Sequence, residues 1–222
     1  MSEKIETLLK ESRTYQPSAK TKAAAHIQDY ETEYKKSIAD PEAFWSGVAK
    51  ELEWFTPWNK VLEWNYPFAK WFVGATCNIS YNCLDRHIKN GRKNKVAVIW
   101  VGENDTERVF TYGQLYRQVN RCANALKKLG LKQGDRVTIY LPKIPEQVIA
   151  MLACARIGVI HSVVYSGFSA PALANRINDA EAKLVITADV GFDRGKTIQL
   201  KPVVDEAIKT CPTIDHVVVV RR

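Results

Sequence analysis

Hydrophobic residues in the stretch 134–188 occur in two alternating patterns, short continuous runs and segments with helical spacing. The second of three continuous runs is almost entirely apolar, as expected of a strand that is covered on both faces. The segments between the runs predict helices that open near Pro145 and Ser169, and Gly158 suits the end of the first helix. This alternation predicts parallel strands joined by right-handed crossovers. The three predicted strands lie at residues 136–141, 159–165 and 184–187.

The flanking segments extend the same alternation. Thr111 and Gln114 match a capping box, and the apolar residues that follow at helical spacing predict a helix that ends at Gly130. A polar turn is expected at residues 103–108, and the next element begins at residue 109. Further elements are predicted at residues 77–89 (helix), 95–101 (strand), 200–211 (helix) and 216–221 (strand).

The N-terminal quarter of the chain has a different character. Residues 1–25 are polar and are expected to be loose, whereas residues 27–49 predict two helices, with Asp40 capping the second and Pro41 at its first position. Residues 53–72 carry four tryptophans and two prolines and fit neither the helical nor the strand period. We expect an irregular arm that large aromatic side chains anchor to the main body. The alternative is a stacking platform for bases.

Composition narrows the class of protein. With 222 residues, 46% hydrophobic and 25% charged, the chain is long enough for one large soluble domain or for a domain with an appendage. It has no apolar segment long enough for a signal peptide or a membrane span. The five cysteines are odd in number and lack CxxC spacing, which predicts reduced thiols, a cytoplasmic protein and no metal site.

The formal net charge of +8 has two interpretations, a lysine-rich surface or attraction for a polyanion. Basic residues are scattered, and only Lys60 and Lys70 lie among the aromatic residues of the arm, so we expect no nucleic-acid partner. His87 is the histidine that most invites a catalytic role, but capping or core packing is the interpretation that we favour. The oligomeric state is not readable from the sequence.

In a parallel sheet of this kind, ligands bind beyond the carboxyl ends of the strands. Two segments reach that edge. One is the turn Tyr165-Ser166-Gly167, where glycine permits close approach of a ligand and the following helix offers free N–H groups to an anion. The other is the loop 191–196, in which Arg194 and Lys196 flank Gly195 and suit a phosphate. A plain turn and a solvated loop are the alternatives.

Motifs of catalysis are missing from the sequence. It contains no GxxxxGK[ST] loop, no Ser/Thr/Gly-rich phosphate loop, no GxSxG elbow, and no cluster of histidines and cysteines with metal-binding spacing. We therefore assign no catalytic residue and no metal ligand. On its residues alone, the chain is expected to bind an anion without catalysing a reaction.

Several long stretches closely resemble the N-terminal part of AMP-forming acetyl-CoA synthetases, in the superfamily of adenylate-forming enzymes. The resemblance covers nearly everything from Asp29 to Val220. The matching stretches are DYETEYKKSIADPEAFW, WFTPWNKVLEWNYPFAKWF, NISYNCLDRHI, PEQVIAMLACARIGVIHSVVYSGFS, and LVITAD followed by RGK and LK.

The resemblance implies a fold and a division of the chain. The fold would be α/β, a parallel-sheet βαβ subdomain of the adenylate-forming fold, preceded by a mostly helical and irregular N-terminal extension. Residues 1–25 would be a loose tail, residues 26–84 the extension, and residues 85–222 the truncated first part of the AMP-binding domain.

The resemblance also implies a reaction. Acetate would attack ATP to give acetyl-AMP and pyrophosphate, and the thiol of CoA would then displace AMP. The adenylation machinery, with the main sites for ATP and Mg²⁺, would lie beyond residue 222, so we expect this chain to be an inactive fragment. Propionate or another short acid is an alternative substrate. A non-catalytic module that binds nucleotides or a partner is a further alternative.

What the chain carries, by this resemblance, is part of the CoA site. Tyr165, Ser166 and Gly167 stand where the family usually has Phe-Gly-Gly, so an aromatic ring would stack on the adenine of CoA. The family's Arg-x-Gly-Lys/Arg loop matches at Gly195 and Lys196. The first arginine of that family loop corresponds to Asp193 in this chain, and the neighbouring Arg194 would take its role.

Overall fold

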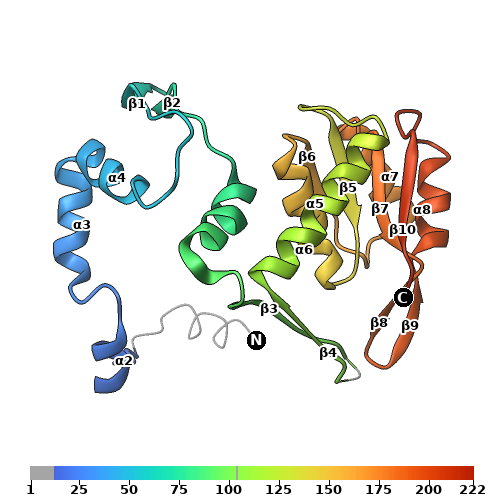
Figure 1. Cartoon of the computed structure of the whole chain (residues 1–222), viewed down its shortest axis with the longest axis horizontal. Coiled ribbons are helices and arrows are strands. Elements are labelled where there is room, and N and C mark those ends of the chain that lie inside the picture. Colours follow the sequence, from blue (N-terminus) through green and yellow to red (C-terminus); the bar gives the residue numbers. More distant parts are fainter. Residues whose placement is uncertain (1–12, 104) are drawn as a thin grey trace, which may run out of the picture. The chain divides into compact units, whose positions relative to one another are not determined.

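The computed structural model describes residues 13–103 and 105–222, and the chain divides into two compact units (Figure 1). The first unit comprises Met1–Glu51 and Lys60–Trp71, and the second comprises Leu52–Asn59 and Phe72–Arg222. Part of the predicted loose tail lies outside the described residues. No helix in the described part of the chain is both long enough and apolar enough to cross a membrane.

Short helices and one hairpin make up the first unit. The Asp40 carboxylate accepts a hydrogen bond from the Ala43 N–H at 2.9 Å and Pro41 stands at the first helical position, so the predicted break between two helices is confirmed. Residues 19–24 are helical, so the prediction of a wholly loose tail is wrong there. Among the described residues its elements are α2 (Ala19–Ala24), α3 (Tyr30–Ala39), α4 (Pro41–Ala49), β1 (Lys60–Asn65) and β2 (Phe68–Val73), and the last two residues of β2 belong to the second unit.

The prediction of an irregular arm at residues 53–72 is wrong for its second half, which forms the β1–β2 hairpin. Aromatic residues lie on both faces of this hairpin, which removes the alternation that identifies a strand. Trp64, Tyr66 and Phe68 are 66%, 82% and 72% exposed, so these three do not act as the predicted anchors.

The first half of the arm does pack as predicted. It belongs to the second unit, where the rings of Trp54 and Trp58 lie 5.4 and 5.1 Å from the ring of Phe72. Phe55 packs edge-on against Tyr81 at 5.0 Å. Because Phe72 belongs to the same predicted arm, confirmation of the anchoring rests on the contact of Phe55 with Tyr81.

A four-stranded parallel sheet in the order β10-β7-β5-β6 organises the second unit. Helices α5 and α6 cover one face of the sheet, and α7 and α8 cover the other (Figure 1). The parallel sheet with helical crossovers is therefore confirmed. The strands are β5 (Arg136–Tyr140), β6 (Ile160–Val163), β7 (Leu184–Ala188) and β10 (His216–Val220). The helices are α5 (Tyr112–Lys128), α6 (Pro145–Arg156), α7 (Ala170–Asp179) and α8 (Lys201–Ile208).

Strands β5 and β7 form the buried centre of this sheet, and Val137, Ile139 and Val185 have no exposed surface. Strand β6 is at the edge of the described sheet, where Ile160 and Val163 are exposed. The prediction that the second strand is covered on both faces is therefore wrong. An apolar run cannot distinguish a central strand from an edge strand, because that distinction depends on which strands come to lie beside it.

Two predicted helix ends are confirmed in detail. The Thr111 hydroxyl accepts from the Gln114 N–H and the Gln114 side chain accepts from the Thr111 N–H, which completes the capping box of α5. After α6, Gly158 takes φ +72° and the Val159 N–H donates to the Cys154 carbonyl at 2.9 Å. This left-handed turn satisfies the last carbonyls of the helix and starts the chain toward β6.

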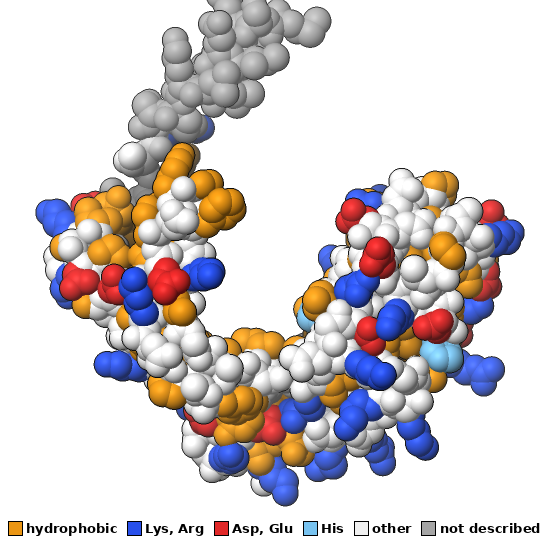
Figure 2. All heavy atoms as spheres, turned by 90° about the horizontal axis from the view of Figure 1, so that it is seen from above, with side chains coloured by type: hydrophobic (Ala, Val, Ile, Leu, Met, Phe, Trp, Pro, Cys, Tyr) orange, Lys and Arg blue, Asp and Glu red, His pale blue; other side chains and the backbone are white. Residues whose placement is uncertain are grey.

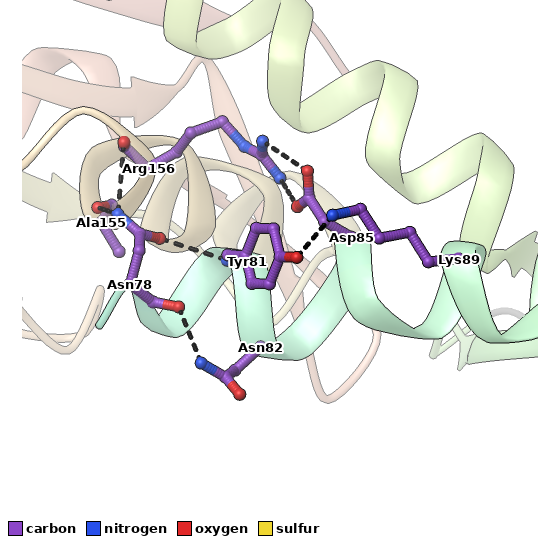
Figure 3. A network of polar contacts seen from close by, with 7 residues as sticks. All are labelled: Asn78, Tyr81, Asn82, Asp85, Lys89, Ala155 and Arg156. Carbon is purple, nitrogen blue, oxygen red and sulfur yellow. Dashed lines mark hydrogen bonds and ion pairs between the residues drawn. The ribbon is translucent and has the colours of Figure 1, made fainter. Parts of the chain in front are cut away.

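The segment predicted as a helix at residues 77–89 is helical and includes the wide turns η1 (Tyr81–Asp85) and η2 (Ile88–Arg92). A polar network fastens it to the end of α6 (Figure 3). The Asn78 side-chain amide donates to the Ala155 carbonyl at 2.9 Å, and Asp85 forms an ion pair with Arg156. The Asn78 amide also donates to the Arg156 carbonyl at 3.3 Å, so it supplies a donor to the last carbonyls of α6, and the ion pair adds a charged contact between the two helices.

The buried hydroxyl of Tyr140 supports the turn after β6. This side chain is 1% exposed, and its oxygen lies 2.8 Å from the carbonyl oxygens of both Ser166 and Phe168. Burial raises the pKa of Tyr140, so the hydroxyl stays protonated and able to donate. A residue at the end of a central strand thus positions the turn that the sequence analysis selected as a site.

Asp135 organises the opposite edge of the sheet, at the entry to β5. Its carboxylate accepts from the Lys132 N–H at 2.7 Å and forms an ion pair with Lys183 at 2.7 Å. The hydrogen bond from Lys183 and then that from Lys132 lower the pKa of Asp135, because both favour the charged form.

Tyr140→Phe should destabilise the second unit, because it leaves two carbonyls near the core without their shared donor. We expect the free energy of unfolding to fall by about 1–2 kcal/mol, measured by urea denaturation followed by circular dichroism. Tyr112→Phe removes a hydroxyl elsewhere in the same unit and is the control, with a smaller expected effect. Equal stability of Tyr140→Phe and the unmodified chain would show that the hydroxyl does not hold the turn.

Asp135→Asn should lower the free energy of unfolding at neutral pH and make it depend less on pH in the acid range. The pKa of Asp135 is lowered in the folded chain, so its contribution is present above the ordinary aspartate pKa of about 4 and is lost as the pH falls through the folded pKa. Urea midpoints measured from pH 7 down to acid pH should converge for the two proteins. Asp205→Asn, which removes an exposed ion pair with Lys201, should change the midpoint little. A constant gap at every pH would contradict this assignment.

Candidate functional site

A cavity of about 470 Å³ opens at the carboxyl ends of the parallel strands. Its walls come from segments that are far apart in the sequence, at residues 100–103, 142–144, 165–167, 191–193, 198, 200 and 222. Residues 142–144 and 165–167 follow strands β5 and β6, residues 191–193 come shortly after β7, and residues 100–103 include the end of β3 (Val96–Val101). The site therefore lies at the edge of the sheet where the topology predicts a ligand.

The turn predicted from the sequence lines this cavity through Tyr165, Ser166 and Gly167. The Tyr165 ring is 64% exposed and meets Phe168 edge-on at 5.8 Å. A Cβ atom at Gly167 would lie 2.5 Å from the Tyr165 ring, so only glycine lets the ring fold back over the turn. The flat face of an aromatic side chain is thereby available to a planar ligand.

The predicted basic loop is a hairpin rather than an irregular loop. Strands β8 (Val190–Asp193) and β9 (Lys196–Gln199) pair antiparallel, and Arg194 and Gly195 form the turn with φ +52° and +72°. Positive φ at both central residues is the geometry of tight hairpin turns.

The structure brings only part of this hairpin to the cavity. Phe192 and Asp193 line the cavity beside the Tyr165 turn. Gly195 lines a neighbouring cavity of about 290 Å³, whereas Arg194 and Lys196 are not among the residues that line either one. The two sequence-predicted segments thus lie on the same sheet edge, with the two basic side chains exposed at its rim.

The sequence analysis missed Glu103, which lies in the turn between β3 and β4 (Glu107–Thr111). Its carboxylate accepts hydrogen bonds from the backbone N–H groups of Arg194 and of Gly195, the latter at 3.3 Å. Glu103 also lines both cavities. No local pattern identifies this contact, because the partners are 91 and 92 residues apart in the chain.

Trp100 and Lys143 are further lining residues that the sequence analysis did not select. The Trp100 indole N–H donates to the Lys143 carbonyl at 2.7 Å, which joins the end of β3 to the end of β5. The Arg222 guanidinium lies 4.8 Å from the centre of the Phe192 ring and 5.9 Å from that of Trp100. The rule that ligands bind at carboxyl ends of strands could have selected Lys143, which follows the predicted strand 136–141.

Other reactive groups lie outside the cavity. The His87 ring packs at 4.9 Å from the Tyr112 ring, and burial and then Arg86 lower the pKa of His87, which favours its neutral form. All five cysteines are free, and burial raises the pKa of Cys154 to about 12. Within residues 13–103 and 105–222, no group of three or more His, Cys, Asp or Glu side chains could hold a metal ion. The arrangement provides a surface for binding.

Comparison with known families gives two matches. The model described as AMP-binding enzyme matches residues 84–222. The model described as acetyl-coenzyme A synthetase N-terminus matches residues 30–83. Together they account for nearly the whole chain.

Curated relatives match along the same length. An acetyl-coenzyme A synthetase of Deinococcus radiodurans is 50% identical over 220 residues, which are 98% of this chain and 34% of that protein. One of Gemmatimonas aurantiaca is 53% identical over 218 residues, 98% of this chain and 33% of that protein. The chain therefore spans about a third of the length of these relatives.

Among solved structures, acetoacetyl-CoA synthetase from Streptomyces lividans superposes with a TM-score of 0.83 at 29% sequence identity. The superposition covers 92% of this chain and 34% of that one. The expected adenylate-forming α/β fold is thereby confirmed. On the family match over residues 84–222, this chain belongs to the family of AMP-binding enzymes, and it resembles the N-terminal third of acetyl-CoA synthetases.

Proposed function

We propose that this chain is the N-terminal third of an AMP-forming acetate–CoA ligase. The complete enzyme would join acetate and ATP to give acetyl-AMP and pyrophosphate, and would then transfer the acetyl group to CoA with release of AMP. The observation that carries this proposal is the identity of about half of all residues to acetyl-CoA synthetases along nearly the whole chain. We retain a cytoplasmic location as part of the proposal, and the free cysteines support it.

In this proposal the chain contributes part of the CoA site. The Tyr165 ring would stack on the adenine, and Ser166 and Gly167 would let the nucleotide approach the backbone. Arg194 and Lys196 would contact phosphates from the rim, and Gly195 would offer its backbone. The cavity beside the Tyr165 turn supports this assignment, because it lies between the two predicted segments.

The remaining steps of the reaction would depend on residues outside this chain. The described residues hold a binding cavity and no cluster of side chains that could bind a metal, so ATP and Mg²⁺ would be bound mainly by the rest of the enzyme. We accordingly propose that the 222-residue chain has no ligase activity of its own.

The acyl substrate is the least constrained part of the proposal. The same N-terminal fold occurs in an acetoacetyl-CoA synthetase, whose name indicates a different acid. Propionate or another short acid thus remains an alternative to acetate, because the N-terminal fold is common to both proteins. Activity with a series of short carboxylic acids would distinguish them.

A non-catalytic binding module is the alternative from another class. If the coding sequence stops directly after Arg222, that alternative gains support, whereas continuation into a Ser/Thr/Gly-rich loop supports the ligase. On the face drawn in Figure 2, acidic side chains lie among the basic ones over part of the surface, and several basic side chains stand together along its lower edge. Nucleic-acid binding is not favoured, because the basic residues are scattered along the sequence without interleaved aromatic residues.

The purified 222-residue chain should form no acetyl-CoA from acetate, ATP, Mg²⁺ and CoA, whereas the complete gene product should form it at a normal enzymatic rate. Release of AMP and formation of the thioester are the two measurements, made side by side on both proteins. Turnover by the short chain would overturn the assignment of the adenylation machinery to residues outside it.

CoA binding should depend on the hairpin. Replacing Arg194 and Lys196 together by alanine should weaken CoA affinity on the order of tenfold, because two charge-assisted contacts to phosphate are lost. Isothermal titration calorimetry measures the change. The matched control replaces Lys127 and Lys128, two exposed lysines at the end of α5, by alanine and removes the same charge away from the cavity. An equal loss in both double variants would show that only net charge matters.

A further inference from the structure

The turn of the β8–β9 hairpin already holds an anion, the carboxylate of Glu103. Its two oxygens accept separately, one from the Arg194 N–H and the other from the Gly195 N–H. Both N–H groups belong to consecutive turn residues with positive φ and are directed toward the same carboxylate. Consecutive backbone N–H groups that converge in this way form an anion-binding nest.

The chemistry of this nest suits a phosphate as well as a carboxylate. Either group presents two oxygens at a spacing that two adjacent N–H donors can reach, and hydrogen bonds to charged acceptors are the stronger class. The side chains of Arg194 and Lys196 add positive charge at the same turn. An external anion would therefore bind to the same two N–H groups that Glu103 occupies.

Glu103 is placed so that it can leave this position. It lies in the exposed connection between β3 and β4, whose Gly102 N–H donates to the Thr106 carbonyl at 2.8 Å. The glutamate side chain itself is solvent-exposed, so release of its carboxylate to water costs little. Because it lines both cavities, its release would also change the wall of each.

We propose that Glu103 is an intramolecular competitor for the nest at Arg194 and Gly195, and that a phosphate-bearing ligand binds there only by displacing it. Where the ligand is CoA, this inference rests on the proposed function. For a simple phosphate anion the inference depends only on the observed contact of Glu103 with the Arg194 and Gly195 N–H groups. The competition lowers the affinity of the site and couples ligand binding to the position of the Glu103 side chain.

The test compares Glu103→Gln with the unmodified chain, using inorganic pyrophosphate and CoA as separate probes in isothermal titration calorimetry. Glutamine keeps the shape of the side chain but accepts a weaker, uncharged hydrogen bond. Pyrophosphate should bind about three- to tenfold more tightly to the variant. Glu107→Gln is the matched control, since it removes the same charge from the same hairpin, and we expect less than a twofold change.

A second measurement follows the contact directly. The amide resonances of Arg194 and Gly195 should move in Glu103→Gln and should move in the unmodified chain when pyrophosphate is added, whereas those of Glu107→Gln should stay in place. Unchanged pyrophosphate affinity in Glu103→Gln, or equal gains in both variants, would overturn the inference. Tighter pyrophosphate binding without any binding of CoA would leave the inference standing and contradict the CoA site of the proposed function.

Discussion

The arrangement of the second unit depends on burial of two adjacent parallel strands, β5 and β7, on both faces. Parallel neighbours cannot be joined by a tight turn, so each connection must cross a face of the sheet as a helix. Every strand then ends at the same edge, and every segment that follows a strand begins there. For this reason the segments that follow β5, β6 and β7 meet in one cavity, although they are spread between residues 142 and 193, and the end of the antiparallel strand β3 completes the wall.

Burial of apolar side chains alone does not fix the positions of the connecting segments. Hydrogen bonds from a few polar side chains fix them. Tyr140 directs its hydroxyl at the turn after β6, Trp100 joins two strand ends, and Asn78 fastens the wide-turned helix to α6. Each is a side-chain donor that bonds to a backbone carbonyl of another segment. The shape of the cavity thus follows from hydrogen bonds that originate in the core.

How far the sequence predicts this structure depends on the range of the interaction. Elements with local determinants were predicted well, since Pro145, Gly158 and the Thr111 capping box act within one turn of themselves. The β1–β2 hairpin was missed because both its faces carry aromatic side chains and no alternation remains. The exposed edge position of β6 was missed because burial of a strand depends on its neighbours in space.

The candidate site shows the same division. The topology places the Tyr165 turn and the segment 191–196 at one sheet edge, whereas the pairing of β8 with β9 and the contact with Glu103 were missed, because the partners of Glu103 are brought close only by the fold.

The position of Trp100 makes the cavity accessible to fluorescence measurements. Its indole lies in the wall of the cavity and its N–H is held by the Lys143 carbonyl, while the five other tryptophans lie outside that wall. The emission of an indole responds to the polarity and charge around it. The chain therefore carries an intrinsic fluorescent reporter in the wall of this cavity, and a change in the surroundings of the cavity is open to optical readout without any added label.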